Sequence, residues 1–197
     1  SQNLQELVQQ ESLSQEDLED MKQSVFTMLN RSDHLQKFVE SYRKLAMLPT
    51  PKKERVELSQ LIETTLQLMA PLFKQEKIEV SNTIAFNRWL TIDKNQMEQV
   101  LINLLTNSIY ALSDQNEKQI IIAAEVKEKR IFITITDTGN GIDTEIEDKV
   151  FLPFFTTRKE GAGIGLTLSK SIVEAHGGYL AFQNENDTTS FVICLVE

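Results

Sequence analysis

Apolar residues recur along the first quarter of the chain at alternating steps of three and four positions. The series is Leu18, Met21, Val25, Met28, Leu35, Val39, Tyr42 and Ala46, with Ser32 in the same register. A second apolar stripe lies beside it, at Phe26, Leu29, Phe38 and Leu45. The seven-residue period predicts a long helix, and the double stripe indicates a partner in a helical bundle or dimer. The alternative is a helix that lies flat on its own domain.

Residues with capping chemistry mark both ends of this helix. Ser14 precedes Asp17 by three positions, which predicts a capping box at the start, and the prolines at positions 49 and 51 end the helical pattern. We expect residues 1–50 to form a helical region that packs against a partner helix. The polar and charged residues 51–57 are expected to form a linker.

The pattern changes to a mixture of helical and strand periods over residues 58–197. The expected elements are a helix from Leu58, a strand from Ile78, a helix from Asp93 to about Leu112, strands from Gln119 and Arg130, a helix from about Leu166 to Ala175, and two final strands in "GGYLAFQNE" and "SFVICLV". The two strands on either side of residue 129 are joined by a short charged turn, which predicts a hairpin. Together the elements predict an α+β fold, a two-layer α/β sandwich with helices on one face of a mixed, mainly antiparallel sheet.

Composition limits the classes of partner. The chain has 197 residues, 41% of them hydrophobic, and a formal net charge of −9. This charge, without a long basic run, argues against nucleic acid as a partner. Cys194 is the single cysteine, and no apolar run is long enough for a membrane span. We expect this portion to be cytoplasmic, in a parent protein that could be anchored in the inner membrane.

Two asparagines stand four positions apart on the otherwise apolar helix that follows Asp93. Asn103 and Asn107 share a face of this helix, and asparagine is a poor residue for a helix interior. Their amides therefore need hydrogen-bond partners or a ligand. An amide oxygen suits Mg²⁺, which usually binds one or two protein groups together with phosphates and water. A purely structural pair of buried hydrogen bonds is the alternative.

Two glycine motifs follow strand patterns. "DTGNGID" places Asp137 ahead of Gly139 and Gly141, which is typical of a tight turn but also of a loop that a ligand can approach closely. "EGAGIGL" places three glycines directly before a helix, where backbone N–H groups can bind phosphate. A plain surface loop is the alternative for the second motif.

A phenylalanine-rich segment, "VFLPFFTTRKE", separates the two glycine motifs. Its apolar half contains Phe151, Phe154 and Phe155, and its polar half contains two threonines, an arginine and a lysine. Three neighbouring phenylalanines would expose a large apolar surface if all were solvated, so at least one is expected to be covered. A lid with an apolar underside and phosphate-facing polar tips would account for both halves.

The order of these four features along the chain resembles the nucleotide-binding boxes of the GHKL superfamily. The segments "NLLTNSIYAL" and "PFFTTRKEGAGIGL" are most similar to the catalytic core of sensor histidine kinases, in the subgroup resembling nitrogen-regulatory kinases. The resemblance covers residues 55–197, and residues 18–49 resemble the second helix of the family's dimerisation hairpin. It implies the GHKL ATP-binding fold over residues 58–197, with ATP and Mg²⁺ as ligands. The implied activity is that of a protein-histidine kinase in two-component signalling.

The resemblance also implies roles for single residues. Asp137 would accept a hydrogen bond from the adenine amino group, Asn107 would bind Mg²⁺, and Asn103 would lie near the phosphates. The residues expected to act in catalysis are Asn103, Asn107 and Lys159. The residues expected to bind ATP are Asn103, Asn107, Tyr110, Asp137, Gly139, Gly141, Ile142, Phe155, Thr156, Thr157, Arg158, Lys159, Gly161, Ala162, Gly163, Ile164, Gly165 and Leu166.

The chain departs from the family pattern in three respects. One is that Asp187, Thr188 and Thr189 stand before the last strand, where the family usually has a glycine. Tyr110 stands where the family often has a basic residue, so Arg158 or Lys159 is expected to supply the cation from the lid. Neither His34 nor His176 matches the phosphoacceptor pattern, so the acceptor helix is expected outside this chain. The implied partners are that helix of the parent protein, a response regulator receiver domain, and a second copy in a homodimer of the full-length protein.

Two other functions agree with the same motifs. One is a GHKL ATPase of the gyrase or mismatch-repair kind, in which a glutamate that activates water commonly stands at the position of Asn103. An amide cannot take up a proton, which favours the kinase. The other is a regulatory module that binds nucleotide without transferring phosphate.

Overall fold

The computed structural model describes residues 14–158, 161–185 and 188–196. The chain forms two units, Ser1–Lys44 and Leu45–Glu197, each of which is described by itself.

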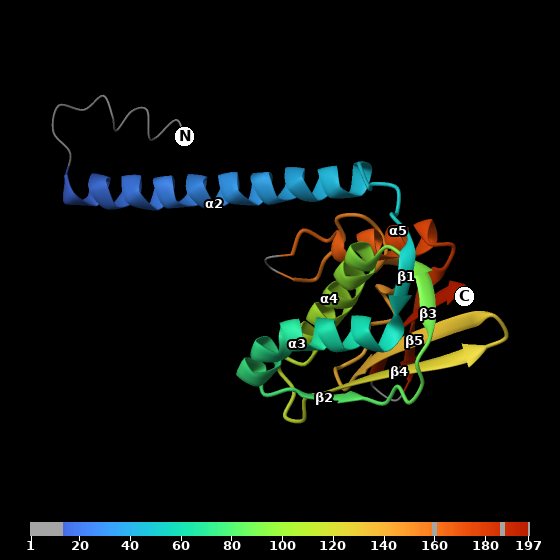
Figure 1. The fold of residues 1–197 in the computed structure, drawn as a ribbon. Coiled ribbons are helices and arrows are strands. Elements are labelled where there is room, and N and C mark those ends of the chain that lie inside the picture. Colours follow the sequence, from blue (N-terminus) through green and yellow to red (C-terminus); the bar gives the residue numbers. More distant parts are fainter. Residues whose placement is uncertain (1–13, 159–160, 186–187, 197) are drawn as a thin grey trace. The chain divides into compact units, whose positions relative to one another are not determined.

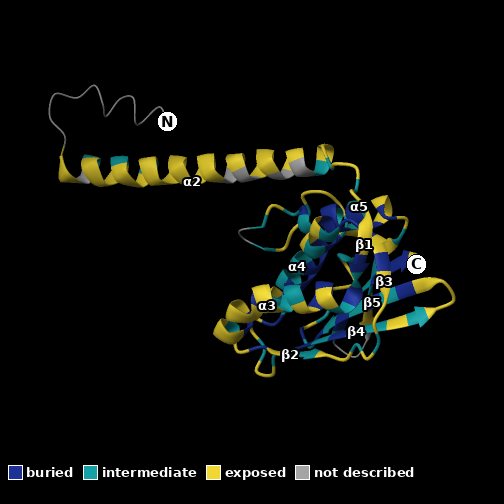
Figure 2. Cartoon of the chain, in the orientation of Figure 1, coloured by how far each residue is buried: buried dark blue, intermediate teal, exposed yellow. Residues whose placement is uncertain are grey.

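The first unit contributes most of helix α2, Gln15–Ala46. The predicted capping box is present at its start: the Asp17 N–H donates to the Ser14 hydroxyl (3.1 Å), and the Ser14 N–H donates to the Asp17 carboxylate (2.9 Å). These bonds hold the pKa of the Asp17 carboxyl below its usual value. Many apolar side chains of α2 are exposed, among them Phe26, Leu29 and Leu35 at 63% or more (Figure 2). The expectation that a bundle or dimer partner covers them remains a prediction.

A five-stranded sheet forms one layer of the second unit. Its strand order is β2-β4-β5-β7-β6, with bounds β2 Glu79–Asn82, β4 Gln119–Lys127, β5 Arg130–Asp137, β6 Tyr179–Glu185 and β7 Thr188–Val196. Strand β2 pairs parallel to β4, and the other three pairings are antiparallel. The predicted hairpin is β4 and β5, which pair in a register that sets Ala124 opposite Ile133.

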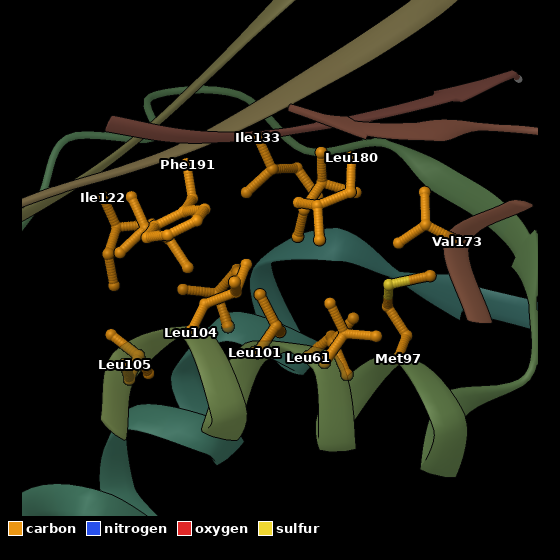
Figure 3. Packing of buried hydrophobic residues seen from close by; sticks show 14 of the residues in the cluster. Leu61, Met97, Leu101, Leu104, Leu105, Ile122, Ile133, Val173, Leu180 and Phe191 are labelled. Atoms are coloured by element: carbon orange, nitrogen blue, oxygen red, sulfur yellow. The ribbon is translucent and has the colours of Figure 1, made fainter. Parts of the chain in front are cut away.

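Three helices pack on one face of this sheet and form the second layer (Figure 1). They are α3 Leu58–Glu76, α4 Lys94–Ala111 and α5 Gly165–Ala175. Figure 3 shows the core between the layers: Ile122, Ile133 and Phe191 of the sheet face side chains of all three helices. Helix α4 contributes Met97, Leu101, Leu104 and Leu105, each at most 1% exposed. The predicted α+β sandwich is confirmed.

Two short strands form a separate sheet that the sequence pattern did not predict. Strand β1, Glu54–Glu57, pairs antiparallel to β3, Trp89–Ile92. Residues 54–57 of the predicted linker 51–57 are therefore a strand. A four-residue strand whose single buried side chain is Val56 gives too little alternation to be recognised among charged neighbours.

The residues that begin α4 bind the chain segment that precedes β1. The Asp93 carboxylate caps α4 by accepting from the Gln96 N–H (3.1 Å), and it also accepts from the Lys52 N–H (2.8 Å). The Gln96 side-chain amide donates to the Pro49 carbonyl (2.9 Å). Burial raises the pKa of the Asp93 carboxyl, but these backbone hydrogen bonds outweigh it and hold the pKa below its usual value. Residues 49–52 are thus fixed to the first turn of α4.

A buried histidine joins the start of α4 to the end of α5. The Asp93 N–H donates to Nε2 of His176 (2.9 Å), and Nδ1 of His176 lies 2.7 Å from the Ile172 carbonyl. Because Nε2 accepts a hydrogen bond, the proton of the neutral ring is on Nδ1, which donates to that carbonyl. His176 is 7% exposed, so both bonds are shielded from water.

We predict that His176→Leu lowers the free energy of unfolding by about 1–3 kcal/mol, because it leaves the buried Asp93 N–H without a partner. Urea unfolding followed by circular dichroism measures the change. Glu174→Ala, an exposed position two residues earlier, is the control and should have little effect. A His176→Leu variant as stable as the parent chain would contradict the structural role of this histidine.

Candidate nucleotide-binding site

Helix α4 presents its two asparagines on a separate face from the leucines that pack on the sheet. The Asn103 amide donates from Nδ2 to the Ser169 hydroxyl of α5 (3.0 Å). The Asn107 oxygen Oδ1 accepts a hydrogen bond from Nη2 of Arg158 (2.6 Å). Nδ2 of Asn107 is buried without a hydrogen-bond partner in the described part of the chain. Such an orphaned donor is rare in a folded protein and points to a ligand or water at this position.

Asp137 ends strand β5 with a buried carboxyl group. Its side chain is 1% exposed, and Oδ1 accepts from the Gly139 N–H (3.1 Å). Burial raises the pKa of the Asp137 carboxyl, and Ser108 and the Gly139 N–H oppose this change. The Ser108 hydroxyl forms no hydrogen bond of normal geometry among the described residues, so we regard its effect as weak. Asp137 is a buried acceptor with capacity for a further donor.

The loop after Asp137 lies directly against the end of α4. A Cβ on Gly139 would approach the Asp137 carboxylate to 2.8 Å and the Ala111 side chain to 2.9 Å, so only glycine fits. Gly141 has a φ of +75°, which other residues rarely adopt. Asn184 of β6 holds the far side of the loop, because its amide accepts from the Ile142 N–H (3.2 Å) and donates to the Ile142 carbonyl (2.8 Å).

The phenylalanine-rich segment separates its side chains by exposure. Phe151 packs against Phe182 of β6 with ring centroids 6.1 Å apart, and its carbonyl accepts from the Thr167 hydroxyl (3.0 Å). Phe155 is half-buried, whereas Phe154 is 39% exposed. The prediction that the three rings are not all solvated agrees with this arrangement. A short 3-10 helix, η1 Glu147–Lys149, precedes the segment.

The second glycine motif contacts both α4 and the phenylalanine-rich segment, whose described residues 150–158 are called the lid below. Gly163 has a φ of +66°, and a Cβ there would lie 2.5 Å from the Phe154 carbonyl carbon. A Cβ on Gly165, the first residue of α5, would overlap the Asn103 side chain. No side chain caps this end of α5. The N–H groups of its first turn are therefore suited to a phosphate.

Arg158 is the point where the lid segment reaches α4. Besides its bond to Asn107, its guanidinium carbon lies 4.3 Å from the centroid of the Tyr110 ring. Burial lowers the pKa of the Arg158 guanidinium, and Tyr110 opposes this change.

Contacts thus connect several of the predicted site residues around α4. Asn103 contacts Gly165 and Ser169, Asn107 and Tyr110 contact Arg158, and the Asp137 loop contacts the end of the helix. The remaining predicted residues are distributed as follows: Thr156, Thr157 and Ala162 are exposed, Ile142, Gly161 and Leu166 are half-buried, and Ile164 is buried. Lys159 lies outside the described residues.

Three residues at this site were not found from the sequence. Ser169 and Asn184 form hydrogen bonds across the fold, and the buried Ser108 hydroxyl lies near Asp137 without a hydrogen-bond partner among the described residues. None of the three stands in a motif that would single it out. Ser108 alone could have been suspected, since it directly follows Asn107 on a helix face that is otherwise apolar.

The donor groups suit a magnesium ion that is coordinated mainly by a bound nucleotide and water. The described residues contain no group of three histidine, cysteine, aspartate or glutamate side chains that could hold a metal. The Asn107 oxygen accepts a hydrogen bond from the positive guanidinium of Arg158, so it already faces a cation. Mg²⁺ needs only one or two protein groups when phosphates supply the remaining ligands. The residues therefore fit a Mg²⁺ ion that arrives with a nucleotide.

Comparison with known proteins identifies relatives in signal transduction. The sensor histidine kinase ZraS of Salmonella typhimurium is 31% identical over 155 residues, which cover 77% of this chain and 32% of ZraS. The signal transduction histidine-protein kinase AtoS of Escherichia coli is 30% identical over 155 residues, covering 77% of this chain and 25% of AtoS. The chain thus spans about a third or less of the length of these relatives.

Solved structures support the same fold. The catalytic domain of the histidine kinase ThkA is 27% identical with a TM-score of 0.66, covering 73% of this chain and 95% of that domain. ThkA in complex with the response regulator TrrA matches with a TM-score of 0.69 at 23% identity, covering 89% of this chain and 51% of the ThkA chain, which shows the fold alone.

More than half of the chain, residues 92–197, matches one family, and these residues include both asparagines, the Asp137 loop and the second glycine motif. The resemblance to the GHKL superfamily is confirmed, while the nitrogen-regulatory subgroup remains a prediction. The chain belongs to the family of histidine kinase-, DNA gyrase B- and HSP90-like ATPases.

Proposed function

We propose that this chain is the catalytic part of a protein-histidine kinase of a two-component system. It binds Mg-ATP and transfers the γ-phosphoryl group to a histidine on a dimerisation helix, for relay to the receiver domain of a response regulator. The observation that carries the proposal is the convergence on α4 of three segments: the Asp137 loop, the lid and the glycine loop. The names of ZraS, AtoS and ThkA, all histidine kinases, support it.

Asp137 is suited to the adenine end of the site. Its buried carboxylate has spare acceptor capacity, and the adenine amino group is a donor, whereas guanine has a carbonyl at that position. Gly139 keeps the loop thin where it crosses the end of α4.

The glycine loop and Arg158 are suited to the phosphate end. The uncapped first turn of α5 offers N–H groups, and the half-buried guanidinium of Arg158 offers a positive charge in a chain of net charge −9. Asn107 would hold Mg²⁺ through Oδ1, and the ion would neutralise charge on the phosphates. Phosphoryl transfer needs positioning and charge stabilisation more than covalent chemistry from the protein.

The amide at Asn103 favours transfer to a protein over hydrolysis. It donates to Ser169 and lies against Gly165, and an amide has no basic group that could take a proton from water. A GHKL ATPase and a regulatory module remain the competing functions, and the assay with γ-labelled ATP and a dimerisation hairpin separates them.

The acceptor is proposed to lie on another helix of a longer parent protein. His176 is buried with both ring nitrogens bonded, so it cannot serve as a nucleophile without breaking the link between α4 and α5.

We propose the division into a dimerisation region at residues 1–50 and an ATP-binding domain at residues 58–197, with homodimerisation of the full-length protein. No helix in the described ranges is long and apolar enough to cross a membrane. A cytoplasmic location of this portion is part of the proposal.

Asn107→Ala is predicted to weaken Mg-ATP binding by about tenfold to a hundredfold, because a contact to a charged group is lost. Isothermal titration in Mg²⁺ and in EDTA measures this, and the loss should be largest with Mg²⁺. Asn95→Ala, the same substitution at an exposed position of α4, is the control. Unchanged affinity of Asn107→Ala in Mg²⁺ would remove this residue from the site.

Asp137→Asn is predicted to stabilise the ligand-free chain at pH 7 while weakening ATP binding. Burial raises the folded-state pKa of Asp137 above its unfolded value, so the ionised carboxylate costs stability at neutral pH. The cost falls as the pH decreases through the folded pKa, so the advantage of the asparagine variant should shrink in acid. Urea unfolding between pH 4 and 7 tests the sign. Lower stability of the variant at pH 7 would contradict the inference that burial of the ionised Asp137 carboxylate costs stability.

Mixing the chain with γ-labelled ATP and a dimerisation hairpin that contains the acceptor histidine tests the proposed activity. We expect an acid-labile phosphoryl label on the hairpin, slow hydrolysis without it, and no label with the Asn107→Ala chain. Rapid hydrolysis by the chain alone would establish the ATPase alternative. Nucleotide binding without transfer to the hairpin would establish the regulatory module.

A further inference from the structure

The positive charge at the phosphate end of the site is delivered by a contact between two distant segments. Tyr110 lies one turn after Asn107 on α4, and Arg158 belongs to the lid. The guanidinium carbon of Arg158 is 4.3 Å from the Tyr110 ring centroid, within the range of a cation–π contact. The same guanidinium donates to Oδ1 of Asn107 (2.6 Å). One arginine therefore joins the helix and the lid.

The described contacts of Arg158 include no ion pair with a carboxylate. Its side chain is half-buried, and the groups that hold its guanidinium among the described residues are the Asn107 amide oxygen and the Tyr110 ring. A partly desolvated guanidinium held by an amide oxygen and an aromatic ring retains N–H donors for an anion. A phosphate group matches both its charge and its planar donor geometry.

The bond to Asn107 has a further consequence. Oδ1 of Asn107 is the oxygen that would bind Mg²⁺. The amide oxygen has two lone pairs, but a guanidinium 2.6 Å from it and a divalent cation on the same atom would repel each other at short range. Metal binding therefore favours departure of Arg158 from Asn107, and the Tyr110 ring is the contact that can persist during this movement because it does not involve the amide.

We propose that Tyr110 is a positioning residue that keeps Arg158 beside Asn107, so that the arginine occupies the metal-binding oxygen in the free chain and turns to the phosphates when Mg-nucleotide binds. The proposal rests on the proposed function, that this site binds Mg-ATP. It assigns the positive charge at the phosphate end to Arg158 and the placement of that charge to Tyr110, since no lysine or arginine stands near Asn107 on α4.

A thermodynamic cycle of binding affinities tests the pairing. Arg158→Gln should weaken ATP by about tenfold to a hundredfold, ADP by less, and adenosine not at all. Tyr110→Leu should weaken ATP by about threefold to thirtyfold, the range of a cation–π contact. The double variant should bind ATP no worse than Arg158→Gln alone, because the tyrosine acts only through the arginine.

Two further variants separate positioning from a general structural effect. Tyr110→Phe keeps the ring and should bind ATP like the parent chain. Tyr110→Lys combined with Arg158→Gln places a cation on α4 itself and should recover at least tenfold of the affinity that Arg158→Gln loses. Tyr110→Leu should leave adenosine binding unchanged, which a distorted site would not do.

The exchange at Asn107 has its own readout. In nuclear magnetic resonance spectra of chain labelled with nitrogen-15, the side-chain Nε–H signal of Arg158 should shift on addition of ADP with Mg²⁺. ADP in EDTA should shift it less, since Asn107 then keeps the arginine. In Tyr110→Leu the signal of the free chain should move toward that of a solvated arginine.

Each outcome decides one point. Additive losses in the double variant, or a Phe variant as weak as the Leu variant, would overturn the positioning role while leaving ATP binding intact. An Arg158 signal that responds equally to ADP with and without Mg²⁺ would overturn the exchange. Failure of the parent chain to bind ATP, ADP or adenosine would reject the proposed function and this inference together.

Discussion

The burial of one face of α4 against the sheet is the constraint on which the candidate site depends. Met97, Leu101, Leu104 and Leu105 are almost completely buried, and their packing fixes how the helix is rotated about its axis. Removing any one of these leucines would leave a cavity and cost about 2–5 kcal/mol. Because the rotation is fixed, the positions of the two asparagines are fixed as well. The loops then take their places by direct contact with this helix.

The close approaches of glycine residues show how little freedom those loops have. Gly139 lies against Ala111, and Gly165 lies against Asn103, both at distances that exclude a Cβ atom. The site is therefore built by the same close packing that forms the core, with amides and glycines in place of leucines. If the proposed phosphate site is correct, an acidic chain attracts the anion through oriented N–H groups and one arginine and not through its net charge.

The sequence predicted the elements that are long enough to show their period. Helix α4, the β4–β5 hairpin and helix α5 were expected within a few residues of their observed bounds, and so was the α+β sandwich. Strands β1 and β3 were not. Strand β1 has a single buried side chain, Val56, and β3 alternates over only two buried residues, Leu90 and Ile92, directly before the helix cap at Asp93. Asn184 and Ser169 were missed for another reason: their partners, Ile142 and Asn103, lie more than forty residues away. For Tyr110, the sequence showed a missing basic residue and suggested a lid cation, but only the fold shows that the tyrosine ring itself contacts Arg158.

The anchoring of residues 49–52 to the first turn of α4 connects the chain before β1 mechanically to the helix that carries the two asparagines. A helix rises about 1.5 Å per residue, so Asn107 lies roughly 20 Å along the axis from the Asp93 cap. A helix of this length bends little, so a pull on Pro49 or Lys52 acts on one end of a stiff helix whose other end carries Asn107, the proposed ligand of Mg²⁺. The hydrogen bond between Asp93 and His176 also connects this point to the end of α5. The opposite end of α5 starts at Gly165, the last residue of the glycine loop. These hydrogen bonds do not involve the five-stranded sheet, so they connect the chain before β1 to both sides of the proposed phosphate site through α4 and α5.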